Sequence, residues 1–295
     1  MQAKNIVIAL VALALIGAVV FLFLTSGKDT VVIVDRPADD TSVEVAVPEP
    51  ADVTMEEPLP VPEPVRGEQT SIGRSVSGAE LTAYHFGTGE REILLVGGVH
   101  GGYSPNTARL AQEFVTYFSN NPSAIPSGLM VTVIPNLNPD GSQVSGAAGR
   151  FNANDVDLNR NFDCEWSATG MWQSRQVSGG SAPFSEPEAV ALRDYVEEYN
   201  PVAAVVWFSA EGKVYPSACG TTPSRDSVTL AATFASAAGY PAEAEFDAYA
   251  ITGDMVNWMA KEGIPAISVL LSDHQGTEWS KNEAGIKAIL NTYAQ

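Results

Sequence analysis

The sequence is poor in cysteine and in positive charge, and each shortage excludes a class of protein. Its 295 residues include two cysteines, which lack the close spacing of a zinc ribbon or a thioredoxin-like redox motif. Lysine and arginine number 16 against 35 aspartates and glutamates, which gives a formal net charge of -19. Such a chain offers no basic face to phosphate groups, so we exclude nucleic acid as a partner.

The two cysteines, Cys164 and Cys219, leave two alternatives open. In an oxidising compartment they would form one disulfide. Closing a loop of this length would stabilise the fold by about 4 kcal/mol in the chain-entropy model. Otherwise they are two unrelated buried thiols. Whether the disulfide forms therefore depends on the compartment, and the start of the chain helps to predict that compartment.

Residues 1–28 have the pattern of a membrane anchor. Lys4 precedes an unbroken apolar run over residues 6–24, which as a helix would be roughly 28 Å long, close to the hydrocarbon thickness of a bilayer. Neither an Ala-x-Ala cleavage site nor a cysteine for lipid attachment follows directly. We therefore expect an uncleaved single-pass transmembrane helix, with the rest of the chain outside the cytoplasm.

Residues 29–70 have the composition of a linker. Prolines alternate with glutamates between residues 48 and 64, and such a segment buries too little apolar surface to fold. Proline and self-repelling charge favour an extended chain. We interpret the segment as a disordered stalk, with a partner-binding segment as the alternative.

Residues 71–295 alternate short apolar runs with helical patterns. This alternation predicts an α/β domain around a mixed, mostly buried sheet. Ser185 and Glu188 have the spacing of a capping box at the start of one helix. A turn at residues 87–89 joins the first two strands. The predicted strands are 81–86, 92–99, 129–135, 202–208 and 266–271, and the predicted helices are 106–118, 185–199, 227–238, 253–262 and 281–293.

A cluster of polar residues near the middle of the domain is suited to an anion. Arg160 can hold a carboxylate through two parallel hydrogen bonds, Asn159 adds an amide donor beside it, and Arg150 brings a second fixed positive charge. The alternative is a surface turn with a structural arginine. Other polar residues, among them His100, follow predicted strands, where ligands of such sheets gather.

Four motifs occur in an order that resembles the zinc carboxypeptidases, the carboxypeptidase A-like metallopeptidases. The resemblance implies an eight-stranded mixed sheet with helices on both faces. It also implies that Arg150 polarises the scissile carbonyl, that Asn159 and Arg160 hold the substrate's terminal carboxylate, and that Tyr249 closes over the peptide. The motifs are Gly97-Gly98-Val99-His100-Gly101-Gly102, Asn138-Pro139-Asp140-Gly141, Asp157-Leu158-Asn159-Arg160-Asn161-Phe162 and Tyr249-Ala250-Ile251-Thr252-Gly253.

The chain departs from this pattern at the positions that carry the chemistry. His100 is the remaining metal ligand, whereas Ser104 and Phe208 stand at the other two ligand positions. Leu270 replaces the glutamate that acts as general base. A catalytic zinc needs three protein ligands, and hydrolysis needs a proton acceptor. We therefore expect no zinc cofactor and a degenerate, catalytically inactive member that binds the carboxyl ends of peptides, such as cell-wall peptides.

Two other functions remain open. A rewired site that uses His100, Glu211 and His274 would hold zinc and give an active metallocarboxypeptidase or peptide amidase. Alternatively, the domain is a structural subunit of an extracellular assembly. The peptide-binding groove that the resemblance implies would then bind no ligand.

Overall fold

The computed structural model describes residues 67–220 and 222–295. The predicted transmembrane anchor and the linker up to residue 66 lie outside these residues. Within the described ranges, no helix combines the length and apolar character needed to cross a membrane.

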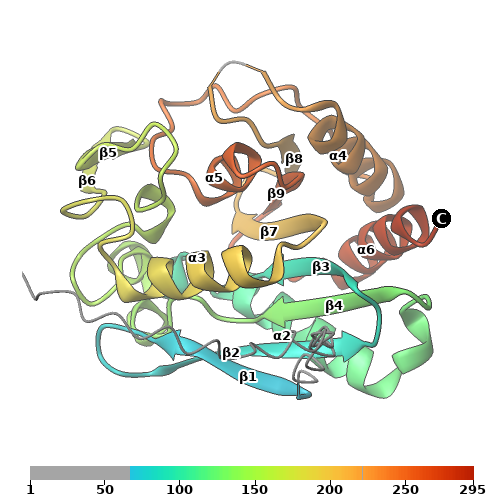
Figure 1. The fold of residues 1–295 in the computed structure, drawn as a ribbon. Coiled ribbons are helices and arrows are strands. Elements are labelled where there is room, and N and C mark those ends of the chain that lie inside the picture. Colours follow the sequence, from blue (N-terminus) through green and yellow to red (C-terminus); the bar gives the residue numbers. More distant parts are fainter. Residues whose placement is uncertain (1–66, 221) are drawn as a thin grey trace, which may run out of the picture. The chain divides into compact units, whose positions relative to one another are not determined.

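A seven-stranded mixed sheet forms the centre of the domain, in the order β1-β2-β4-β3-β7-β9-β8 (Figure 1). The four central strands are mutually parallel, and β1, β2 and β8 run antiparallel to their neighbours. The expected eighth strand is therefore absent from the sheet that the described residues form. The strands are β1 Gln69–Arg74, β2 Glu80–Gly87, β3 Arg91–Val96, β4 Leu129–Ile134, β7 Ala203–Ser209, β8 Lys213–Pro216 and β9 Ala266–Leu271.

Helices cover both faces of the sheet, as predicted. On one face, Phe114 and Phe234 pack with Val205 in one hydrophobic cluster. On the other, Leu192 and Trp258 pack with strand residues such as Val206. Because neighbouring residues of β7 enter opposite clusters, its continuous apolar run is explained by burial on both sides. The first face carries α2 Pro105–Asn120, α4 Arg225–Ala238 and α6 Trp279–Tyr293, and the second carries α3 Pro187–Tyr199 and α5 Met255–Lys261.

The two strands joined by the predicted turn at residues 87–89, β2 and β3, do not pair with each other. β4 lies between them, antiparallel to β2 and parallel to β3. Both edge strands, β1 and β8, were not predicted. Nor was a separate ribbon formed by β5 (Thr169–Trp172) and β6 (Arg175–Ser178). These strands are short or half exposed, so they lack the long apolar runs of the central strands.

The predicted capping box at Ser185 is wrong. Helix α3 begins at Pro187, and its N-cap residue is Glu186, without a side-chain capping bond. Proline is well tolerated in the first helical turn, because a backbone N–H at this place has no acceptor within the helix. The Ser185 hydroxyl instead donates to Glu186 Oε1 at 2.8 Å.

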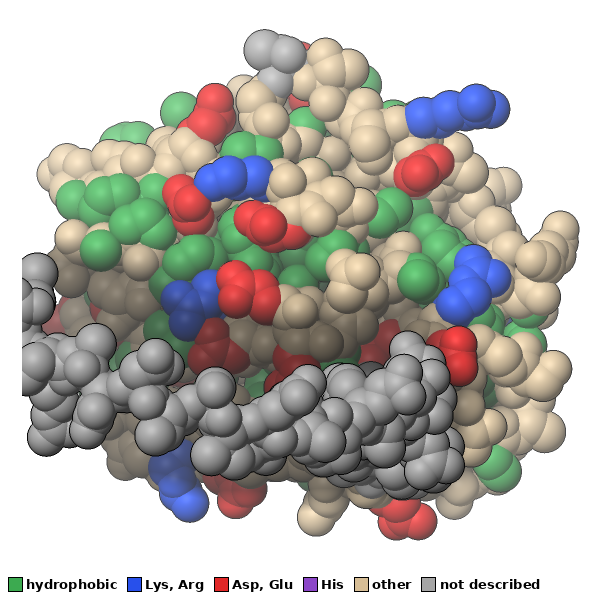
Figure 2. Space-filling model, in the orientation of Figure 1, with side chains coloured by type: hydrophobic (Ala, Val, Ile, Leu, Met, Phe, Trp, Pro, Cys, Tyr) green, Lys and Arg blue, Asp and Glu red, His purple; other side chains and the backbone are tan. Residues whose placement is uncertain are grey.

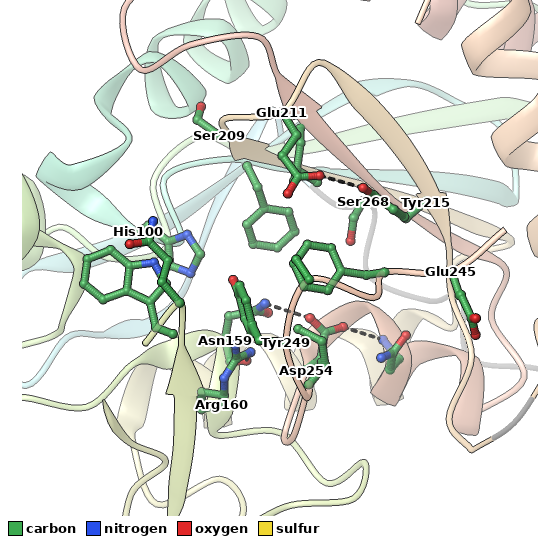
Figure 3. A pocket seen from close by; sticks show the side chains of 18 of the residues that line it. His100, Asn159, Arg160, Ser209, Glu211, Tyr215, Glu245, Tyr249, Asp254 and Ser268 are labelled. Atoms are coloured by element: carbon green, nitrogen blue, oxygen red, sulfur yellow. Dashed lines mark hydrogen bonds between the residues drawn. The ribbon is translucent and has the colours of Figure 1, made fainter. Parts of the chain in front are cut away.

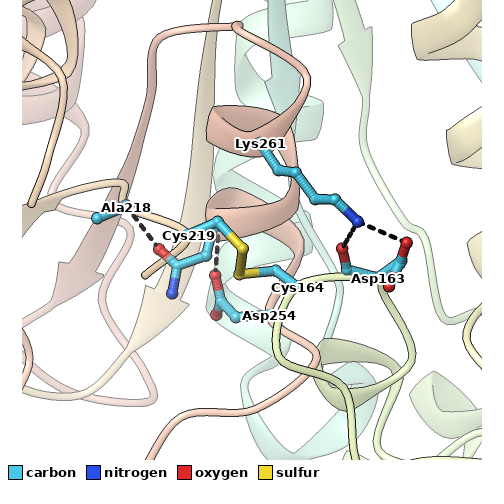
Figure 4. Close-up of a disulfide and its surroundings, with 7 residues drawn as sticks. Asp163, Cys164, Ala218, Cys219, Asp254 and Lys261 are labelled. Carbon is cyan, nitrogen blue, oxygen red and sulfur yellow. Dashed lines mark hydrogen bonds and ion pairs between the residues drawn. A yellow bond between two sulfur atoms is a disulfide. The ribbon is translucent and has the colours of Figure 1, made fainter. Parts of the chain in front are cut away.

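A disulfide joins Cys164 to Cys219, which confirms the first of the two alternatives (Figure 4). It ties the chain after Asn161 to the loop after β8. Two further contacts cross near it: Lys261 pairs with Asp163 at 2.6 Å, and the Ala218 amide donates to Asn257. These links fix one wall of the cavity described below.

The surface in Figure 2 carries charges of both signs. Outside the grey atoms, lysine, arginine, aspartate and glutamate side chains lie scattered among hydrophobic and neutral ones. The visible described residues of this face therefore form no continuous basic surface.

Candidate functional site

A cavity of about 580 Å³ opens beyond the carboxyl ends of the parallel strands (Figure 3). It brings together almost all the residues that the sequence analysis singled out. Ser104 is the exception, because it is fully buried and does not line the cavity. The lining residues that were predicted are His100, Arg150, Asn159, Arg160, Phe208, Glu211, Tyr249, Leu270 and His274.

The loop after β3 places His100 at the cavity wall. Gly101, directly after it, has a φ of +39°, and a Cβ there would lie 2.6 Å from the carbonyl oxygen of Gly149. Only glycine fits this close approach between backbones. The loop therefore packs tightly against residues 141–150, the segment that ends at Arg150.

His100, Arg150 and Asp157 form a buried, charge-balanced group. Arg150 donates from Nε to Asp157 Oδ2 at 2.8 Å, and its Nη1 lies 3.1 Å from His100 Nδ1. A guanidinium has only donors, so Nδ1 of His100 must accept and Nε2 carries the ring proton. Nε2 faces Asp157 Oδ1 at 3.5 Å. The arginine thus faces the nitrogen lone pair that a metal would need.

The charges in this group are set by burial and by one another. Burial, together with the charge of Arg150, lowers the pKa of His100 to about 4. Burial disfavours ionisation of Asp157, but the charge of Arg150 and the nearby imidazole of His100 hold the pKa of that carboxyl well below its usual range. At neutral pH the imidazole is therefore neutral and the carboxylate is ionised.

Arg160 is a buried cation whose charge also acts on the buried carboxyl groups of Asp157 and Asp254. Its side chain is 1% exposed, and it donates to the carbonyl oxygens of Asn159 and Met171 at 3.0 and 2.9 Å. Its Nε has no hydrogen-bond partner, and among the described residues no carboxylate lies within ion-pair distance. The Tyr249 ring lies 5.8 Å from the guanidinium carbon. Because Arg160 lines the cavity and makes no direct ion pair with a described residue, its guanidinium is available to an anionic ligand.

Asn159 has a partner that the sequence analysis did not anticipate. Its Nδ2 donates to Asp254 Oδ2 at 2.7 Å (Figure 3). Its Oδ1 accepts from the Met255 amide at 3.1 Å. Asp254 in turn caps α5 by accepting from the Asn257 amide. Asn159 therefore ties the segment of Arg160 to the start of α5, with one amide hydrogen left for a ligand.

The residues at the family's metal positions do not fit zinc. Ser104 Oγ lies 3.3 Å from His274 Nδ1, and the Phe208 ring packs 5.3 Å from the His100 ring. Within residues 67–220 and 222–295, no group of three histidine, cysteine, aspartate or glutamate side chains can hold a metal ion. The alternative set, His100, Glu211 and His274, shares the cavity without converging on one point.

Several residues of the site were missed. Trp172 lies 4.7 Å from the Arg150 guanidinium carbon, and Tyr103 contacts Trp172 edge-on. Trp172 belongs to the unpredicted β5–β6 ribbon. Asp157 stands inside a motif that we had quoted, and an acid seven residues from Arg150 was a usable signal for the buried pair.

Comparisons with known proteins agree with the geometry. A family model described as zinc carboxypeptidase matches residues 62–292. Carboxypeptidase Z from Rattus norvegicus is 32% identical over 158 residues, which cover 43% of this chain and 24% of that protein. Murein peptide amidase A from Escherichia coli strain K12 is 31% identical over 144 residues, which cover 45% of this chain and 55% of that protein. The chain thus spans between a quarter and about half the length of these relatives.

A comparison of folds gives the same result. Bovine thrombin-activatable fibrinolysis inhibitor, solved in complex with tick carboxypeptidase inhibitor, superposes with a TM-score of 0.64 at 18% identity. The match covers 77% of this chain and 88% of that one. At this identity the likeness concerns the fold alone.

Proposed function

Because the chain belongs to the zinc carboxypeptidase family, we propose that its cavity binds the carboxyl-terminal end of a peptide without hydrolysing it. The environment of the Arg160 side chain is the main support for this proposal. The Arg160 cation lies in the cavity wall and makes no direct ion pair with a described residue. A terminal carboxylate would supply that ion-pair partner.

The chemistry of the neighbouring side chains supports binding without hydrolysis. A zinc-bound water has a pKa of about 7, whereas free water has one of about 15.7. His100 is the one nitrogen ligand at the family's metal positions, and Arg150 faces its lone pair. Leu270 lines the cavity, and we assign it to the position of the family's proton-accepting glutamate; its side chain cannot take a proton.

Calorimetric titration with paired peptides tests the binding. We expect a short peptide acid to bind at least tenfold more tightly than the same peptide amidated at its carboxyl end, because a charged hydrogen bond to a buried arginine is lost. Arg160→Gln should abolish this difference, while Arg225→Gln on the exposed surface of α4 should leave it intact. Equal binding of the peptide acid and the amidated peptide by the natural protein would refute the proposal.

An active metallopeptidase or peptide amidase is the second candidate. It is favoured by the presence of His100, Glu211 and His274 in one cavity and by the similarity to a murein peptide amidase. Metal analysis after incubation with zinc separates the two candidates. Stoichiometric zinc, together with peptide cleavage that His100→Ala removes, would establish the active enzyme and refute our proposal.

A purely structural role predicts a third result. The groove would then be a remnant, and Arg160→Ala would change no ligand interaction. A measurable loss of peptide binding in this variant would exclude that role.

A further inference from the structure

The β5–β6 ribbon lies against both arginines of the cavity wall. It forms a two-stranded sheet of its own, separate from the seven-stranded sheet (Figure 1). A ribbon of two strands is marginally stable at best by itself, so its place in the fold depends on contacts with other segments. Those contacts are made at two places, the base of the ribbon and the strand β5.

The base of the ribbon is anchored to the segment that carries Arg160. The Asp157 amide donates to the carbonyl oxygen of Ser178, the last residue of β6, at 3.0 Å. The side chain of Asn161 donates from Nδ2 to the Gly179 carbonyl oxygen at 2.7 Å. The ribbon therefore keeps a fixed position relative to residues 157–161.

Two consecutive residues of β5 hold Arg160. The Met171 carbonyl oxygen accepts a hydrogen bond from Arg160 Nη2 at 2.9 Å. A Cβ atom at Gly170 would lie 2.8 Å from Arg160 Cδ and 3.1 Å from its Nε, so the ribbon backbone packs directly on the arginine stem. The Arg160 side chain is almost fully buried and has no free space into which it could yield. Its position therefore requires glycine at residue 170.

The next residue, Trp172, holds Arg150. Its ring centroid lies 4.7 Å from the Arg150 guanidinium carbon, within the range of a cation–π interaction. Tyr103 packs edge-on against the indole, and its own ring lies 5.7 Å from the same guanidinium carbon. Trp172 is buried, so water has little access to this contact. The two rings therefore limit the directions in which the guanidinium can turn.

The other acids of the cavity do not set the directions of the arginines. Asp254 and Glu165 both line the cavity, but among the described residues neither forms an ion pair with an arginine. Asp254 instead accepts from the Asn159 side chain and caps α5. Its charge acts on Arg160 only from beyond ion-pair distance, whereas the ribbon touches that side chain directly.

We infer, on the basis of the proposed function, that the β5–β6 ribbon positions both arginines for a peptide carboxyl end. Gly170 and Met171 hold Arg160, and Trp172 holds Arg150. All three are positioning residues, because they act on the peptide through an arginine. A binding site needs such support, since a side chain that must be ordered by its ligand binds that ligand more weakly.

Calorimetric titration with a short peptide acid tests the role of Trp172. Trp172→Leu keeps an apolar side chain but removes the aromatic face, so we expect the Kd of the peptide to rise about threefold to tenfold. Trp172→Phe keeps an aromatic face and should bind the peptide at least about twofold more tightly than the leucine variant. A role in packing alone predicts equal affinities, because both substitutions leave a smaller apolar side chain.

The same pair of substitutions in an Arg150→Gln background shows whether Trp172 acts through the arginine. With the cation removed, the phenylalanine and leucine variants should bind the peptide equally. A difference that persists would show that the ring contacts the peptide directly, which would overturn the positioning role. The melting temperature of each variant shows that it is folded at the temperature of the titration.

Gly170→Ala tests the hold on Arg160. The added methyl group displaces the arginine stem, so the difference in affinity between peptide acid and amidated peptide should fall from about tenfold or more to about threefold or less. Gln176→Ala, an exposed position on β6 of the same ribbon, is the matched control and should keep the full difference. A full difference in Gly170→Ala, or equal affinities of the two Trp172 variants, would overturn the inference.

The two proposals fail in different ways. If the carboxylate grip is wrong, the natural protein binds the acid and amide forms of the peptide equally. If only the role of the ribbon is wrong, the natural protein distinguishes the two forms, and the Gly170 and Trp172 variants distinguish them equally well.

Discussion

At the scale of single residues, Arg150 has the largest structural role in the site. Its guanidinium lies between the carboxylate of Asp157 and the imidazole of His100, and all three side chains are at least 95% buried. Asp157 balances the charge of Arg150. Arg150 donates hydrogen bonds to Asp157 and to His100. Removing one therefore leaves a buried group without its partner.

Asp157→Asn tests this dependence. The substitution leaves the Arg150 charge buried and unpaired, so we expect the free energy of unfolding to fall by about 3–5 kcal/mol. Urea denaturation followed by circular dichroism measures it. Asp194→Asn, which breaks the exposed pair with Arg193, is the control and should cost less than about 1 kcal/mol. Similar losses in both variants would contradict the account.

His100 predicts a pH dependence of stability. Its pKa is about 4 in the folded protein and about 6.5 when unfolded, so between these values the unfolded chain binds more protons. Stability should therefore fall as the pH drops from 6.5 towards 4, by up to about 3 kcal/mol from this group. In His100→Gln this part of the slope should vanish when unfolding is measured across that pH range. An unchanged slope would show that His100 is not held neutral.

At the scale of elements, the disulfide holds two segments of the cavity wall together. Cys164 lies four residues after Arg160, and Cys219 lies between Ala218 and Gly220, which both line the cavity. Helix α5 packs nearby and is linked to both segments by Asn257 and Lys261. The wall is therefore fixed by covalent and polar contacts rather than by the sheet alone.

Removing this link should lower stability. The bond closes a loop of 55 residues, so the double variant Cys164→Ser, Cys219→Ser should lose about 4 kcal/mol of unfolding free energy. Denaturation of the variant and of the oxidised natural protein under the same conditions measures the difference. If the two proteins are equally stable, the disulfide does not constrain the unfolded chain as supposed.

The central elements were predictable from the sequence because burial on both faces leaves long apolar runs. β4, β7 and β9 were found within one residue of their ends. Edge elements such as β1 and β8 lack this signal, and their existence depends on pairing with strands that are distant in sequence. The start of α3 was misplaced because Ser185 bonds to nearby side chains instead of capping the helix.

At the scale of the whole molecule, the order of motifs was enough to predict the family and which residues share the cavity. The direction in which each side chain points was not predictable. The contact between Arg150 and His100 joins residues 50 positions apart, and that between Asn159 and Asp254 joins residues 95 apart. Such pairings follow from the packing of several loops, which local patterns do not encode.

The predicted anchor can be tested on the full chain. We expect the natural protein to sediment with membranes and to resist extraction by high salt. Replacing Leu13 and Leu15 by arginine should release it, since each arginine at the centre of a membrane helix costs about 2.5–3.5 kcal/mol. Recovery of the unsubstituted chain in the soluble fraction would refute the anchor.

The guanidinium of Arg150 is a cation that the polypeptide itself provides. We expect a domain built in this way to fold without a bound metal ion. We therefore expect a strong chelator such as EDTA to leave its melting temperature unchanged, whereas a protein whose core is held by bound metal would melt earlier. In an environment where trace metals are scarce, we expect such a domain to keep its fold.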